Sequence, residues 1–233
     1  MRLNRYIASS GYCSRRKADR LIEEGSVTVN GKPGVIGMDV SPNDRVAVNG
    51  TTLTPTAHHI YLAYNKPIGI ICTSDPNAKD NIIDAVGYPE RVFHIGRLDV
   101  ASSGLILLTN DGDIVNAILR SEGQHEKEYM VHVDRPITRS FLTRMRSGVM
   151  LDGRMTLPAK ASRQGEYRFK ITLTEGRNRQ IRRMCEALGY NVTRLKRTRV
   201  MNINLGDLGE GNYRLLTKTE RHDLLTELGL WNG

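Results

Sequence analysis

The start of the chain shows hydrophobic spacing typical of two short helices. In the second of them, Ala18, Leu21 and Ile22 recur at helical intervals and form one apolar stripe. Ser14 stands where an N-cap residue is expected, and Gly25 suits the left-handed position just after a helix ends. The pattern therefore predicts a helix pair at the beginning of the chain.

Two strand-like segments follow this helix pair, at 26–29 and 45–48, and each alternates polar with apolar residues. Each runs directly into an Asn-Gly pair, a dipeptide that strongly favours a tight hairpin turn. We therefore predict a compact helix-pair-plus-hairpin domain at 1–50. The next residues, 51–59, are rich in threonine, contain Pro55 and show no periodicity, so they predict a linker.

The rest of the chain, residues 60–233, is predicted to be a second domain built mainly from strands. Strand-like hydrophobic runs stand at 60–64, 105–109, 128–133, 168–173 and 213–216. They alternate with few helices and show neither a βαβ rhythm nor a glycine-rich nucleotide loop. The chain is therefore predicted to be α+β, with a mixed, mostly antiparallel sheet in its second domain.

Composition narrows the class of protein. The chain has 233 residues, of which 39% are hydrophobic and 25% charged, as in an ordinary globular protein. The longest aliphatic run, 105–108, is too short to span a bilayer, so no membrane contact is expected. The first residues lack an apolar leader, and the three cysteines are scattered, which indicates the reducing cytoplasm. We expect a monomer.

The net charge of +9 is concentrated in one part of the chain, because residues 136–200 hold 16 basic and 4 acidic side chains. Eight of the basic residues cluster at Arg177, Arg179, Arg182, Arg183, Arg194, Lys196, Arg197 and Arg199. Such a cluster is typical of a protein that binds a polyanion, and the guanidinium fork suits phosphate. A solvated basic face is the alternative that the charges alone leave open.

Candidate chemistry centres on the segment 94–112, HIGRLDVASSGLILLTNDG. Asp99 lies there among glycines and apolar residues, two positions after Arg97. Such an aspartate is either a structural ion-pair partner or a reactive carboxylate, and the residue types alone leave both open. The histidines and cysteines show no metal-ligand spacing, so we expect neither a metal nor another cofactor.

Three segments, in this order, resemble the motifs of RNA pseudouridine synthases. Residues 96–105, GRLDVASSGL, are similar to the G-R-L-D-x-x-S-x-G-L signature. Residues 127–129 resemble the K-x-Y motif, and residues 176–182 resemble G-R-x-x-Q-I-R. The first domain resembles the S-four type RNA-binding domain. Together these segments identify the chain as a member of the RsuA, RluB, RluE and RluF group. The sequences of its motifs look most like those of the RluF type.

The resemblance implies a role for each matching residue. Asp99 is the catalytic aspartate, and Arg182 is the cation that keeps it ionised. Tyr129 packs on the flipped uracil and exchanges a proton with it, while Ile181 closes the other side of the pocket. Arg97 occupies the space that the flipped base leaves. A core position for Tyr129 and a structural salt bridge for Arg97 are the alternatives.

RNA contacts are expected from six further basic residues, namely Arg177, Arg179, Arg183, Arg15, Arg16 and Lys17. The apolar positions of a helix predicted at 178–188 are Ile181, Met184, Cys185 and Leu188. They form one buried stripe with Arg182 at its edge, so Arg179 and Arg183 point away, toward solvent or RNA.

These expectations combine into one function. The chain is expected to flip a uridine of large-subunit precursor ribosomal RNA toward an essential aspartate and to isomerise it to pseudouridine. Small-subunit ribosomal RNA and a transfer RNA anticodon stem-loop are alternative substrates. A non-catalytic RNA-binding assembly factor is an alternative function. A glycosidase would need a second carboxylate that activates water, and the sequence shows no such paired carboxylate near Asp99.

Overall fold

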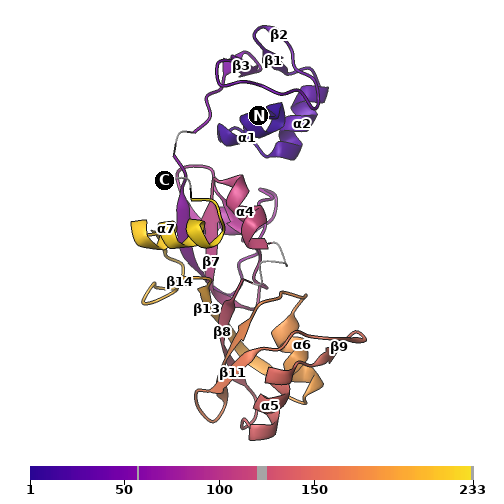
Figure 1. The fold of residues 1–233 in the computed structure, drawn as a ribbon, viewed down its shortest axis with the longest axis vertical. Helices are drawn as coiled ribbons and strands as arrows, with labels where there is room; N and C mark the ends of the chain where they lie inside the picture. Colours follow the sequence, from indigo (N-terminus) through magenta and orange to yellow (C-terminus); the bar gives the residue numbers. More distant parts are fainter. Residues whose placement is uncertain (57, 120–124, 232–233) are drawn as a thin grey trace. The chain divides into compact units, whose positions relative to one another are not determined.

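The computed structural model describes residues 1–56, 58–119 and 125–231 (Figure 1). These residues form two compact units. The first contains Met1–Ile60 together with the short segments 89–91 and 110–112, and the second contains the remainder of the chain. Each unit has hydrophobic clusters of its own.

The first unit is a pair of helices packed on a small antiparallel sheet, drawn in indigo in Figure 1. Its elements are α1 (Leu3–Ser9), α2 (Arg15–Glu23), β1 (Val27–Val29), β2 (Lys32–Pro33), β3 (Val46–Val48) and β4 (Thr51–Thr52). The strand order is β2-β1-β3-β4. Leu3 and Ile7 of α1, Ile22 of α2, and Val27 and Val46 of the sheet share one core.

Local signals explain these elements. The Ser14 hydroxyl accepts a hydrogen bond from the Lys17 N–H at 3.2 Å, which caps α2 as the sequence predicts. Gly25 follows the helix with φ at 72°, in the left-handed conformation expected there. Both Asn-Gly pairs have positive φ at both residues, as two-residue hairpin turns require.

The structure differs from the prediction at the start of the expected linker 51–59. Thr51 and Thr52 form strand β4, because the second Asn-Gly turn brings the chain back beside β3. Leu53 is then buried in the core of the first unit. Ala57 lies outside the described residues.

The second unit is built on a large sheet. Its helices are α3 (Ile82–Val86), α4 (Gly112–Leu119), α5 (Arg139–Ser147), α6 (Gln180–Ala187) and α7 (Lys218–Glu227). Its strands are β5 (Tyr61–Lys66), β6 (Phe93–Ile95), β7 (Ser103–Thr109), β8 (Lys127–Val133), β9 (Met150–Leu151), β10 (Arg154–Met155), β11 (Lys160–Arg163), β12 (Arg168–Leu173), β13 (Val192–Val200), β14 (Ile203–Asn204) and β15 (Tyr213–Leu215).

The main strands of this sheet follow the order β11-β12-β8-β13-β7-β5-β15. Every pairing along this path is antiparallel except that of β7 with β13, which is parallel. The predicted α+β class and the mixed, mostly antiparallel sheet are therefore confirmed. All five predicted strand runs appear as β5, β7, β8, β12 and β15.

Several elements of the second unit are absent from the sequence prediction, and strand β13 and helix α7 show why. Strand β13 shows in the sequence only as a basic cluster, because four of its nine residues are arginine or lysine and two register shifts interrupt its alternation. Helix α7 is also missed, although the Thr217 hydroxyl and the Glu220 carboxylate form a capping box at its start. In both cases the sequence carries a weak hydrophobic pattern.

Two hydrophobic cores hold helices against the sheet. Val131 and Phe169 of the sheet pack with Phe141 of α5 and Met184 of α6. At the β5–β7 end, α4 and α7 share a second core with those strands (Figure 1). Tyr129 packs against the first core on the same face of β8 as Val131, as its alternating strand predicts.

The parallel pairing of β7 with β13 depends on a glycine. Gly104 has φ at 106°, and a Cβ there would lie 2.2 Å from the carbonyl oxygen and 2.6 Å from the nitrogen of Arg197. Neither atom can move aside, because both belong to the backbone of a central strand. Only glycine therefore allows this close approach.

We expect Gly104→Ala to lower the free energy of unfolding by about 2–4 kcal/mol, through the backbone clash and the positive φ. Gly165→Ala is the matched control, because a Cβ there meets only Arg168 side-chain atoms at 3.8 Å and beyond. Urea unfolding followed by circular dichroism measures both variants. Equal midpoints for the two variants would refute the steric argument.

Candidate active site

Asp99 lies in the loop between β6 and β7 and is half-buried. Three hydrogen bonds shape this loop. The Ser102 N–H donates to the Asp99 carbonyl at 3.0 Å, and the Gly69 N–H donates to the Val100 carbonyl at 2.9 Å. The Leu98 N–H donates to the buried Cys72 sulfur at 3.3 Å. The segment after β5 therefore holds the loop on both sides of the carboxylate.

Arg182 connects helix α6 to the same loop. Its Nη2 donates to the Ala101 carbonyl at 2.8 Å and to the Ser102 hydroxyl at 3.4 Å, while Nη1 donates to the Val192 carbonyl at 3.2 Å. Within the described residues the guanidinium and the Asp99 carboxylate form no salt bridge. Burial and the nearby Arg179 lower the pKa of Arg182, and the Asp99 charge opposes that shift.

The arrangement differs from a simple ion pair. Arg182 positions the loop through backbone carbonyls, and its charge acts on Asp99 through space. Its Nε is buried without an acceptor in the part of the chain that the structure describes. A buried donor without an acceptor costs free energy.

The register of the sheet determines how far Tyr129 lies from the start of β7. Gly104 pairs with Arg197, Arg197 pairs with Tyr129, and Tyr129 pairs with Ile171. Two strand spacings, about 10 Å, separate the Tyr129 backbone from the start of β7. The half-buried phenol packs against the core that also contains α6, so Tyr129 shares the α6 face of the sheet.

Helix α6 is shorter than predicted but buries the predicted stripe, because Ile181, Met184 and Cys185 all lie in the core. It begins at Gln180 because Arg179 adopts a left-handed conformation at the N-cap. Ile181 is 4% exposed. Burial raises the pKa of the Cys185 thiol to about 12, so this thiol remains protonated at neutral pH.

Two of the arginines expected to contact RNA instead hold the β9–β10 hairpin. All three donor nitrogens of Arg177 bond within the protein, to the Glu175 carboxylate and to the carbonyls of Arg154 and Met155. Arg183 was predicted to point toward solvent or RNA, but it is half-buried and forms an ion pair with Asp152 at 2.5 Å. Both arginines therefore fasten the hairpin to the region of α6.

The remaining members of the basic cluster also divide between buried and exposed positions. Arg197 is buried and donates from Nε to the Leu105 carbonyl at 2.6 Å. Arg199 forms an ion pair with Glu126 at 2.8 Å. Arg179 and Arg194 are exposed. The eight residues therefore do not form one free basic surface, because acids from distant parts of the chain pair with several of them.

The other predicted binding residues are accessible. Arg97 is exposed in the loop, two residues before Asp99. Arg15, Arg16 and Lys17 are all exposed on the first turn of α2. Each of these side chains is therefore open to a ligand from solvent.

Lys66 belongs to the site but was missed from the sequence. It ends β5, is fully buried, and donates from Nζ to the carbonyls of Pro67 and Ile70 at 2.8 and 2.9 Å. Burial lowers its pKa, while the charges of Cys72 and Asp99 oppose that shift. The sequence signal that could have identified it is a lysine at the end of an apolar strand. Lysine is rarely buried without a partner, so a lysine in this position indicates a special role.

Neither a metal site nor a membrane span emerges from the described ranges. Residues 1–56, 58–119 and 125–231 contain no group of three or more histidine, cysteine, aspartate or glutamate side chains able to hold a metal ion. No helix in these ranges is both long enough and apolar enough to cross a membrane. The expectation that the chain needs no cofactor stays a prediction.

Comparison with known families agrees with this geometry. A family model described as RNA pseudouridylate synthase matches residues 60–187, and one described as S4 domain matches residues 1–46. The chain belongs to the RNA pseudouridylate synthase family. The predicted resemblance, including its S-four type domain, is thereby confirmed, and with it the reaction class, the isomerisation of uridine in RNA.

Similar proteins cover nearly the whole chain. It is 50% identical over 226 residues to the dual-specificity RNA pseudouridine synthase RluF of Escherichia coli (strain K12), covering 96% of this chain and 78% of that one. It is 38% identical to ribosomal large subunit pseudouridine synthase B of Bacillus subtilis, over 94% and 93% of the two chains. A solved pseudouridylate synthase is 32% identical, covers 96% of this chain and 99% of its own, and has a TM-score of 0.70.

We expect Arg182→Ala to slow pseudouridine formation by about a hundredfold, because the Ala101 carbonyl loses its donor and the Asp99 loop shifts. Arg194→Ala is the control, since Arg194 is an exposed arginine of the adjacent strand β13. Single-turnover rates at saturating RNA separate positioning from binding. Similar rates for the two variants would contradict the role assigned to Arg182.

Proposed function

We propose that this chain converts a uridine of large-subunit ribosomal RNA to pseudouridine, with Asp99 as the catalytic carboxylate. The observation that carries the proposal is the hydrogen bond from Arg182 to the carbonyl of Ala101, two residues after Asp99. The Bacillus subtilis relative is named for the ribosomal large subunit, which supports this substrate. We propose a monomer that acts in the cytoplasm, where its three free, buried cysteines would remain reduced.

The reaction rearranges atoms without changing their number. The bond from uracil N1 to the ribose C1′ breaks, a bond from C5 to C1′ forms, the C5 proton leaves and N1 gains a proton. No electron is gained or lost. Asp99 supplies the nucleophile or the negative charge that stabilises the detached sugar or base. The positive charges of Lys66 and Arg182 interact electrostatically with the Asp99 carboxylate.

The remaining assignments concern the flipped base. Tyr129 offers an aromatic face for the uracil and a hydroxyl for proton exchange. Ile181 lies beneath the same part of the sheet, and its burial in the core suits a supporting wall for the pocket. Exposed Arg97 fills the space that the base vacates in the RNA.

The first unit binds RNA without taking part in the chemistry in this proposal. Arg15, Arg16 and Lys17 present three positive charges on one exposed helical turn. Contacts to phosphates position RNA without performing chemistry. Arg177, Arg179 and Arg183 were expected to add to this binding, and Arg179 keeps that role most directly because it is exposed.

A second RNA substrate is favoured by one observation. The Escherichia coli relative, 50% identical to this chain, is named a dual-specificity enzyme. We propose that a transfer RNA anticodon stem-loop that resembles the ribosomal target is the second substrate. Tritium release from each RNA, measured with the same enzyme preparation, tests this directly, and release from the ribosomal RNA alone would refute it.

We expect Asp99→Asn to abolish isomerisation while RNA affinity stays within about twofold, because the amide keeps the shape and loses the charge and nucleophilicity. Release of tritium from uridine labelled at C5 measures the chemistry, and filter binding measures affinity. Turnover within about tenfold of the unmodified protein would end the assignment. Release of free uracil by the unmodified protein would instead indicate a glycosidase.

We expect the double variant Arg16→Gln/Lys17→Gln to bind RNA more weakly and with a shallower salt dependence. The slope of log affinity against log salt should fall by about 0.7 for each single-strand phosphate that the variant no longer binds. Lys32→Gln is the control, because Lys32 is exposed on β2 of the same unit and lies outside the α2 turn. Equal slopes for both variants would mean that α2 does not contact RNA.

A further inference from the structure

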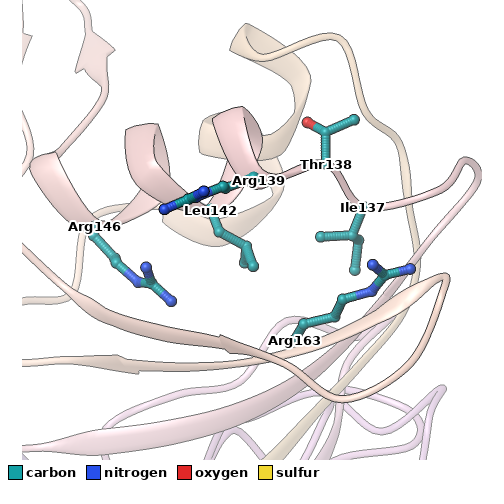
Figure 2. A pocket seen from close by; sticks show the side chains of 6 residues that line it. All are labelled: Ile137, Thr138, Arg139, Leu142, Arg146 and Arg163. Carbon is teal, nitrogen blue, oxygen red and sulfur yellow. The ribbon is translucent and has the colours of Figure 1, made fainter.

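A second basic site lies on the second unit, apart from the Asp99 loop. A cavity of about 330 Å³ opens between α5 and the end of β11. Its lining residues are Ile137, Thr138, Arg139, Leu142, Arg146 and Arg163 (Figure 2). Half of these residues are arginines and none is acidic.

Two of the arginines are held in place with their outer nitrogens free. Arg146 donates from Nε to the Ala161 carbonyl at 2.7 Å, and Arg163 donates from Nε to the Gly165 carbonyl at 3.0 Å. Within the described residues, their Nη atoms have no acceptor. Figure 2 shows these two side chains at opposite ends of the cavity, with Leu142 between them. One hydrogen bond therefore restrains each of these two exposed guanidinium groups and leaves its outer nitrogens available to a ligand.

The charges of this cavity are not balanced by the protein. Among the described residues, no carboxylate forms an ion pair with Arg139, Arg146 or Arg163, whereas Arg177 and Arg199 each have a glutamate partner. Three cations around one cavity repel each other and attract an anion. Guanidinium groups with free Nη pairs suit phosphate, which they bind through two parallel hydrogen bonds.

The remaining lining adds an apolar wall. Ile137 and Leu142 are both buried, so the wall is rigid and apolar enough to contact a ribose or a base. The volume lies at the lower end of the range for ligand cavities, about 300–1,000 Å³. A phosphate with its attached sugar or base therefore matches both the charge and the size of the site.

The position of the cavity relates it to the catalytic loop. Strand β11 is separated from β7 by three intervening strands, or about 19 Å at the usual strand spacing. Helices α5 and α6 pack into the same core, so the cavity lies on the face of the sheet that carries Arg182. If the target uridine of an RNA strand lies at Asp99, only nucleotides that flank this uridine can reach the cavity.

We propose that this cavity binds the sugar-phosphate backbone of the RNA substrate at a nucleotide outside the target loop. The inference rests on the proposed function and adds a second anchor on the catalytic unit. Such an anchor would bind any sequence, because phosphates carry no base identity.

The test compares two double variants on two RNAs. Arg139→Gln/Arg163→Gln removes two charges from the cavity, and Arg144→Gln/Lys218→Gln removes two exposed charges of the same unit outside it. One RNA is the target stem-loop alone, and the other carries the single-stranded nucleotides that flank it. The dissociation constant is measured over a series of salt concentrations.

For the flanked RNA, the cavity variant should bind about tenfold more weakly, and its salt slope should be shallower by about 1.4 if it no longer binds two phosphates. For the stem-loop alone, its affinity should equal that of the unmodified protein. The control variant should match the unmodified protein on both RNAs. Equal affinity and salt slope for the two double variants on the flanked RNA would overturn the proposal.

Competition distinguishes the source of the phosphate. Inorganic phosphate and uridine monophosphate should compete with the flanked RNA only weakly. If uridine monophosphate binds tightly through the cavity while the cavity variant keeps full RNA affinity, the site serves a free nucleotide and the proposal is wrong. If the double variant unfolds, Arg163→Gln alone gives the same comparison against Arg144→Gln.

Two separate measurements test the proposed reaction and the proposed RNA anchor. Tritium release by the unmodified protein on the flanked RNA tests catalysis, and the binding series tests the cavity. Absence of release with a variant-dependent salt slope would refute the proposed reaction and keep the RNA anchor. Release with no difference between the two double variants would keep the reaction and refute the anchor.

Discussion

Where β7 and β13 run parallel, the Cα of Gly104 lies so close to the Arg197 backbone that no side chain fits between them. This close approach sets the geometry of the whole site. It places the Asp99 loop at the start of β7, beside the strand that follows α6. It also places Tyr129 in register with Arg197, on the other side of β13. The Asp99 loop, Tyr129 and helix α6 therefore lie around the same pair of central strands, whose backbones touch at Gly104.

The many arginines of this unit divide between structural and free positions. Some are structural: Arg177 fastens the β9–β10 hairpin, and buried Arg197 bonds to the backbone of β7. Others, such as those around the α5–β11 cavity, have no acidic partner among the residues that the structure describes. A basic cluster in sequence therefore overstates the free charge of the surface, since acids such as Glu126 come from outside the cluster.

Strong local signals were predicted correctly. The cap at Ser14 and the two Asn-Gly turns depend on hydrogen bonds and backbone angles within a few residues. Strand β13 was missed because its charged residues are stabilised by contacts with β7 and β8, which lie far away in sequence. Lys66 was missed for a similar reason, since only the fold supplies the two carbonyls that satisfy its buried ammonium group.

The family, the α+β class and the candidate residues could all be predicted from the sequence, because motifs, helix caps and alternation depend on neighbouring positions. The role of each charged side chain became clear from the fold alone. Arg183 was expected to contact RNA, but in the fold it forms an ion pair with Asp152. Arg182 donates a hydrogen bond to the Ala101 carbonyl. The reason is physical: a guanidinium bonds to whichever acceptor the fold brings within reach, and that acceptor can stand 80 residues away along the chain.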